Sequence, residues 1–205
     1  DYALSDRMAK NRQTVDDFLD NLIDKSLPFA KKDVETIKQY ALQHGATEQL
    51  MPWDFSYWCE KYKSDFYSIN EEEYKPYFDL GSVRDAVLGL ATTLYGISFT
   101  KRNDIPLYHP DVVTYEVRDG ERFMGLLYLD FFPRSSKRGG AWMTSFRESG
   151  FFNGNEERPF VSIVTNFSKP TAETPSLLTF DELTTLLHEF GHALQGLLAE
   201  GKHPT

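Results

Sequence analysis

The chain contains only one cysteine, Cys59, among its 205 residues. A single cysteine cannot form an intrachain disulfide, so buried apolar surface must stabilise the fold, as in proteins of reducing compartments. Uninterrupted apolar runs are short and stay well below the length of about 18 residues that a membrane span requires. No positively charged and then apolar leader follows Asp1. We therefore expect a cytoplasmic protein that does not bind membranes.

The sequence also lacks an excess of positive charge. Lys and Arg total 22 against 31 Asp and Glu, which gives a net charge of -9. This balance would repel the phosphate backbone of a nucleic acid, so nucleic-acid binding is not expected. Internal repeats, low-complexity tracts and flexible linkers are missing from the sequence as well. We therefore expect residues 1–205 to form part of one domain rather than several.

The first part of the chain, residues 1–95, has the apolar periodicity of helices. Pro28 is expected to separate the first two helices, and Pro or Gly residues bound the later ones. The segments with this periodicity cover residues 5–25, 29–43, 54–66 and 83–95. Together they predict a layer of helices.

The middle part, residues 96–178, changes to a period of two, which is typical of strands. β-Branched and aromatic residues are frequent in the segments 112–119, 122–132, 141–146 and 160–166. Asp119 and Gly120 separate the first two segments, and such a pair is a strong signal for a two-residue hairpin turn. These features predict a small sheet of about four strands and an α+β fold that is mostly helical.

The last part, residues 179–205, predicts one amphipathic helix. Thr179 and Glu182 have the spacing of a capping box, while Gly201 and Pro204 are typical of a C-terminal end. At about 100° per residue, the apolar side chains fall on one face, which is expected to contact the core. That face comprises Leu183, Leu186, Leu187, Phe190, Ala193, Leu194, Leu197 and Leu198.

Two histidines lie on the opposite face of the same helix. His188 and His192 are about 40° apart and one turn from each other, so both rings can reach one metal ion. Zinc, which binds neutral imidazoles at about 2.0–2.1 Å, is the expected ion. Glu189 lies beside this face, where it can accept a proton from a zinc-activated water molecule and later donate it to the leaving amine. The alternative is that both histidines are merely solvated on the polar face.

A peptidase site needs a third ligand, for which there are two candidate sources. The short signature that continues to a third histidine is excluded because Gln195 and Leu198 occupy the relevant positions. The other class takes a Glu from a later helix, roughly two dozen residues after the second histidine. His203 could substitute, but it lies between Gly201 and Pro204 in an expected loop. We therefore expect the chain to end inside a larger catalytic domain and to be inactive by itself.

Several segments resemble the thimet oligopeptidase family, in particular its bacterial peptidyl-dipeptidase and oligopeptidase A branch. The segment with both histidines is TLLHEFGHALQGLL, and the upstream segments are YLDFFPRSSKRGGAWM, YEVRD, WDFSYW, PYFDL and LYGISF. The resemblance runs along nearly the whole chain. It implies a zincin-like, mostly helical catalytic domain with a deep channel that admits short peptides, of which this chain is one fragment.

The resemblance also implies roles for individual residues. His188 and His192 would bind zinc and Glu189 would be the general base, while the third ligand and further substrate-binding residues would lie beyond Thr205. Gln195 departs from the histidine that is common in the family at this position, although neither ligand nor base is affected.

The segment Gly139-Gly140-Ala141 gains a role from the same resemblance. We expect it to form a sheet edge whose backbone pairs with an extended peptide, because glycine lets another backbone approach closely. The alternative is that the two glycines simply end a loop. Lys137 and Arg138, which precede them, are expected to be solvated loop charges.

The function that these features predict is zinc-dependent hydrolysis of short peptides by a monomer. The resemblance implies that C-terminal dipeptides are released. The alternative is a non-catalytic peptide- or metal-binding protein that retains the zinc helix. Glu189 favours the enzyme, because zinc binding alone would not require it.

Overall fold

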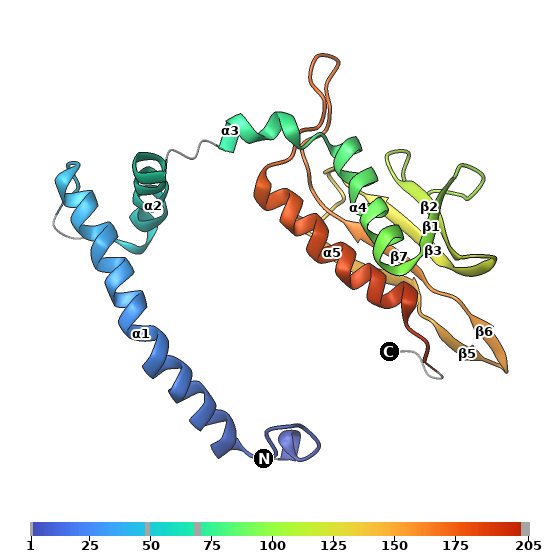
Figure 1. Ribbon diagram of the computed structural model, residues 1–205, viewed down its shortest axis with the longest axis horizontal. Coiled ribbons are helices and arrows are strands. Elements are labelled where there is room, and N and C mark those ends of the chain that lie inside the picture. The colour runs from blue at the N-terminus through green and yellow to red at the C-terminus, as the bar shows by residue number, and fades with distance from the viewer. Residues whose placement is uncertain (1, 48–49, 68–70, 202–205) are drawn as a thin grey trace. The chain divides into compact units, whose positions relative to one another are not determined.

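The computed structural model describes residues 2–47, 50–67 and 71–201 (Figure 1). The chain divides into two compact units, Asp1–Asn70 and Glu71–Thr205. In the described part of the chain, no helix is both long enough and apolar enough to cross a membrane. That both units belong to one catalytic domain remains a prediction.

The first unit is helical. A short 3-10 helix, η1 (Tyr2–Leu4), precedes α1 (Arg12–Gln43) and α2 (Pro52–Tyr67). The expectation of two helices separated by Pro28 is wrong, because Pro28 lies inside α1. A proline has a φ compatible with a helix, so it removes one backbone hydrogen bond while the residues on either side continue the helix.

An aromatic cluster joins α2 to α1. Tyr40 of α1 is 5% exposed, and its ring lies edge-on to Trp58 and Tyr62 of α2, with centroids 6.4 Å and 5.2 Å away. Phe66 stacks on Tyr62 at 4.3 Å. Aromatic contacts around the buried Tyr40 therefore hold this pair of helices together.

The second unit contains short helices, a sheet and two longer helices (Figure 1). Its helices are α3 (Glu71–Tyr74), η2 (Lys75–Tyr77), α4 (Leu80–Tyr95) and α5 (Phe180–Leu198). The strands of the main sheet are β1 (Ile97–Arg102), β2 (Val113–Asp119), β3 (Arg122–Asp130), β4 (Trp142–Arg147) and β7 (Phe160–Val164). A separate hairpin consists of β5 (Gly150–Phe152) and β6 (Asn155–Glu157).

The main sheet has five strands in the order β1-β2-β3-β7-β4, so the expectation of about four strands is one too few. The missed strand is β1, which follows α4 directly after Gly96, a left-handed residue that ends the helix. β2 and β3 form the expected hairpin at Asp119 and Gly120. β7 pairs in parallel with β3 and antiparallel with β4, which leaves β4 as an edge strand.

Both long helices of this unit cover the same face of the sheet. Apolar residues of α4 and α5 share one buried cluster with Leu127 and Leu129 of β3. Leu126 and Tyr128, which alternate with them, pack on the other face. The helical layer expected for residues 1–95 therefore includes a helix, α4, that packs against the sheet.

Candidate functional site

α5 carries the two histidines and begins with the expected capping box. Thr179 Oγ1 accepts a hydrogen bond of 3.1 Å from Glu182 N, and Glu182 Oε2 accepts one of 2.8 Å from Thr179 N. These bonds satisfy backbone donors that a helix otherwise leaves free at its first turn. The start of α5 is thereby fixed.

Burial of one face sets the rotation of α5 about its axis. Leu186, Phe190, Ala193 and Leu197 are each at most 5% exposed. Leu187 was expected on the core face but is 40% exposed. The helix is rotated so that the other edge of its apolar face, away from Leu187, turns toward the sheet. Glu189 lies on that edge and is 8% exposed.

His188 and His192 lie on the exposed face of α5 and point toward each other. Their Nε2 atoms are 3.1 Å apart and their ring centroids 4.8 Å apart. Two ligands of one tetrahedral zinc ion at about 2.0–2.1 Å each are separated by roughly 3.3 Å. Among the described residues, no other side chain forms a hydrogen bond to either ring. The pair therefore fits two ligands of one zinc ion.

The described residues contain no group of three or more His, Cys, Asp or Glu side chains that could hold a metal ion. His203, the alternative third ligand, lies outside the described residues. Gln195 is exposed on α5. Among the described residues, the arrangement thus offers two candidate ligands, His188 and His192.

Glu189 occupies the side of α5 that faces the strands. Gly196 follows it by seven residues and so lies on the same side of the helix. A Cβ at Gly196 would lie 3.2 Å from Val161 in β7 and 3.9 Å from Met143 in β4. No described side chain donates a hydrogen bond to the Glu189 carboxylate. The carboxylate is therefore not engaged by another described side chain.

The segment Gly139-Gly140-Ala141 lies in the loop immediately before β4. Gly140 has a φ of 92°, a conformation that strongly favours glycine. No atom lies within 4 Å of a Cβ built on Gly139 or Gly140, so this part of the loop is open to another chain. No described hydrogen bond connects the segment to His188 or His192, and its part in the site remains a prediction.

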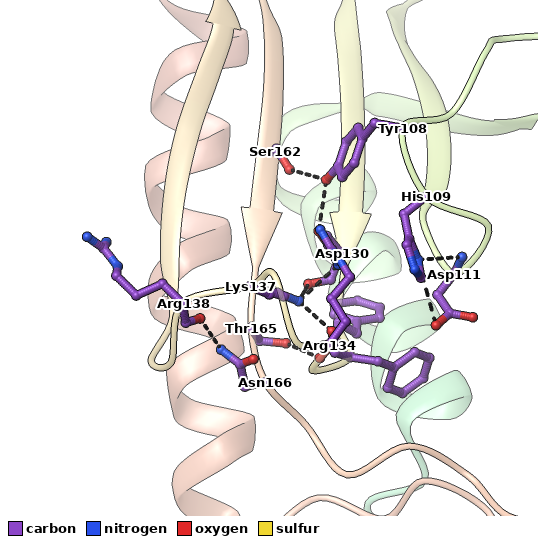
Figure 2. A network of polar contacts seen from close by, with 12 residues as sticks. Tyr108, His109, Asp111, Asp130, Arg134, Lys137, Arg138, Ser162, Thr165 and Asn166 are labelled. Atoms are coloured by element: carbon purple, nitrogen blue, oxygen red, sulfur yellow. Dashed lines mark hydrogen bonds and ion pairs between the residues drawn. The ribbon is translucent and has the colours of Figure 1, made fainter.

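A buried charge cluster underlies the same loop, and the sequence interpretation missed it (Figure 2). Asp130, the last residue of β3, is 1% exposed. It accepts two hydrogen bonds from Arg134, at 2.8 Å and 2.9 Å, and one of 2.9 Å from Lys137. The expectation that Lys137 is solvated is wrong, since its side chain is 2% exposed. The ammonium is buried because it meets a carboxylate and backbone carbonyls.

The protonation of this cluster follows from its contacts. Burial raises the pKa of Asp130, but hydrogen bonds from Arg134 and Lys137 outweigh burial and hold that pKa below its ordinary value. Burial lowers the pKa of Lys137, and the bond to Asp130 offsets part of this effect. Burial also raises the pKa of Tyr108, which donates to Asp130, to about 12. The sequence does carry a signal for this cluster, because Asp130 at the end of an expected strand is followed by Arg134 and Lys137, four and seven residues later.

Comparison with known proteins gives the chain a family. The model of peptidase family M3 matches residues 1–205. An oligopeptidase A of Escherichia coli (strain K12) is 35% identical over 198 residues, which is 96% of this chain and 29% of the relative. A dipeptidyl carboxypeptidase of the same bacterium is 35% identical over 206 residues, which is 100% of this chain and 30% of the relative.

A plant protein is also similar to this chain over nearly its whole length. A probable cytosolic oligopeptidase A of Arabidopsis thaliana is 40% identical over 205 residues, covering 94% of this chain and 29% of the relative. The chain therefore spans less than one third of the length of these relatives. Because the family match covers every residue, the chain belongs to peptidase family M3.

Proposed function

We propose that the full protein is a zinc-dependent peptidase that hydrolyses short peptides, with His188 and His192 as zinc ligands and Glu189 as general base. The observation that carries this proposal is the 3.1 Å separation of the two Nε2 atoms on an exposed helix face. Membership of a peptidase family supports it. We assign the third ligand to residues outside the described ranges.

When bound, zinc supplies Lewis-acid activation of a water molecule and of the scissile carbonyl. Glu189 would accept one proton from the water molecule that adds to the carbonyl carbon. As the C–N bond breaks, Glu189 donates the proton to the amine nitrogen. His188 and His192 stay in place because the capped, partly buried α5 carries both of them.

The substrate would lie along the loop before β4. β4 has no strand partner on its outer side in the described sheet, and the space around Gly139 and Gly140 is open. An extended peptide can add to such an edge through backbone hydrogen bonds. We therefore place Gly139, Gly140 and Ala141 in the substrate-binding site.

Release of C-terminal dipeptides is the finer part of the proposal. The relatives named oligopeptidase A and dipeptidyl carboxypeptidase are each 35% identical to this chain, so identity does not separate internal cleavage from dipeptide release. Mass spectrometry of products from peptides with free and amidated C-termini would separate them. We further propose a monomer that acts in the cytoplasm, which mass photometry and cell fractionation would test.

The alternative function is non-catalytic binding of peptide or metal. The unengaged Glu189 beside the histidines favours the enzyme, since a binding site would not need a base.

The test uses the full protein in three forms: unmodified, Glu189→Gln, and Glu200→Gln as a control whose side chain is 62% exposed and lies two residues after the end of the same helix. Metal content is measured by mass spectrometry, and cleavage of a blocked peptide is followed before and after chelation. We expect one zinc per chain in all forms and chelator-sensitive cleavage in all but Glu189→Gln. Stoichiometric zinc without cleavage of a broad peptide panel would instead establish the binding protein.

A further inference from the structure

The loop between β3 and β4, residues 131–141, is fixed at its start by backbone contacts. Thr165 N donates to Asp130 O at 2.9 Å, and Phe167 N donates to Phe131 O at 2.9 Å. Thr165 Oγ1 also donates to Phe131 O at 3.0 Å. The residues after β7 therefore continue to hold the chain beyond the end of β3.

The middle of the loop is fixed by Lys137. Its Nζ donates to Asp130 O, to Asp130 Oδ1 and to Phe132 O, at 2.9 Å, 2.9 Å and 2.8 Å. An ammonium has three donor hydrogens, so each is used within the loop or at its base (Figure 2). Arg134 adds two bonds to the same carboxylate. This part of the loop cannot move without breaking a buried ion pair, which is costly.

The end of the loop is fixed by Asn166. Its Nδ2 donates to Arg138 O at 2.9 Å and to Gly140 O at 2.7 Å, so both amide hydrogens bind carbonyls on either side of Gly139. Gly140, whose carbonyl is one of these two acceptors, lies two residues before the start of β4 and has the left-handed φ already noted. Asn166 is partly exposed and lies outside the strands, so it has no role in the sheet ladder.

We propose that Asn166 is a positioning residue for peptide binding, which acts by holding the segment Gly139-Gly140-Ala141 in the shape that receives the substrate backbone. The inference rests on the proposed function and deepens it. A loop that is ordered before binding avoids the entropy cost of being ordered by the ligand. Asp130 and Lys137 supply the rigid base, and Asn166 sets the conformation of the part that contacts the peptide.

The experiment compares Asn166→Ala with Ser176→Ala in the full protein. Ser176 also donates one side-chain bond to a carbonyl, Ser168 O at 2.7 Å, but in a different loop. Each variant is made in the Glu189→Gln form, so that the dissociation constant of a short blocked peptide is measured without cleavage. Zinc content, the thermal midpoint and amide hydrogen exchange over residues 138–147 are measured on the same samples.

For Asn166→Ala we expect peptide binding about five- to tenfold weaker, because two hydrogen bonds no longer fix the loop. Amide hydrogen exchange over residues 138–147 should become faster, while the zinc content and the thermal midpoint of the protein stay unchanged. With Glu189 present, KM should rise by a similar factor with kcat nearly constant, as expected when ground state and transition state lose the same contact. Ser176→Ala should match the unmodified protein.

A second variant, Asn166→Asp, keeps the size of the side chain but removes both donors. It should weaken binding at least as much as Asn166→Ala. Unchanged peptide affinity in both variants would overturn the inference, whether or not exchange accelerates. Failure of the proposed function is distinguishable, because then the unmodified protein itself would not cleave the peptides.

Discussion

Nη2 of Arg158 donates a hydrogen bond of 2.6 Å to the carbonyl oxygen of Leu197, at the C-terminal end of the helix that carries the two histidines. The same guanidinium donates through Nε to Met124 O in β3, at 3.1 Å. Arg158 is 8% exposed. One buried cation thus satisfies a free carbonyl of α5 and connects that end of the helix to the sheet.

Replacing Arg158 with Met should lower the free energy of unfolding by about 2–3 kcal/mol, because buried carbonyls lose a charged donor. Urea unfolding measures the change. Arg7→Met serves as the control, since the Arg7 side chain is 72% exposed and pairs with the exposed Asp6. Equal effects of the two substitutions would contradict the assigned role.

Asp130 predicts a specific acid dependence of stability. Its pKa is lower in the folded state than in the unfolded state, where it is about 3.9. The ionised carboxylate therefore contributes stability above about pH 3.9 and loses that contribution as the pH falls through the folded pKa. The stability difference between the unmodified protein and Asp130→Asn should be greatest near neutral pH and shrink below about pH 3.9. Unfolding measured from pH 7 to pH 2 tests this, and a constant difference would refute it.

Gly140 and Gly139 form a matched pair of sites. Gly140→Ala should destabilise the protein by about 1–2 kcal/mol, because an L-residue is strained at positive φ. Gly139→Ala, where a Cβ meets no atom within 4 Å, should not. Peptide affinity should fall with Gly140→Ala. If a bulky residue at Gly140 left affinity and turnover unchanged in the full protein, this segment would not be part of the substrate site.

Glu189→Gln separates metal binding from catalysis. The amide cannot take up a proton, so kcat/KM should fall by at least about 100-fold while zinc stays bound. Steady-state kinetics and metal analysis on one preparation measure both quantities. Loss of zinc from this variant would show instead that Glu189 supports the metal site.

The two histidines alone should bind zinc weakly. In a preparation of the 205 residues, we expect weaker zinc binding than in the full protein and no peptide hydrolysis, because a site with two ligands lacks the usual third. Competition with a chromogenic chelator measures the affinity, and His188→Ala should abolish even the weak binding. Robust, chelator-sensitive cleavage by the 205-residue chain would show that it already contains a third ligand, and His203 would be the first candidate.

Local patterns in the sequence determined where α5 begins and where the β2–β3 hairpin turns. The capping box at Thr179 and Glu182 and the hairpin at Asp119 and Gly120 are interactions between near neighbours, which the sequence displays directly. The spacing of His188 and His192 likewise follows from helix geometry. The family resemblance, carried by several segments, is confirmed by a match over the whole chain.

Tertiary structure decided what local patterns do not contain. The sequence places the acid Asp130 seven residues before Lys137, but it does not show that this pair is buried, because burial depends on how β3, β7 and β4 align. The borders of the core face on α5 depend on how that helix rotates against the strands, so Glu189 is buried and Leu187 exposed. Asn166 reaches Gly140 across 26 residues of sequence. The sequence by itself thus specified which chemical groups the helix carries, and the packing of distant segments decided their surroundings, since burial depends on contacts that no local period encodes.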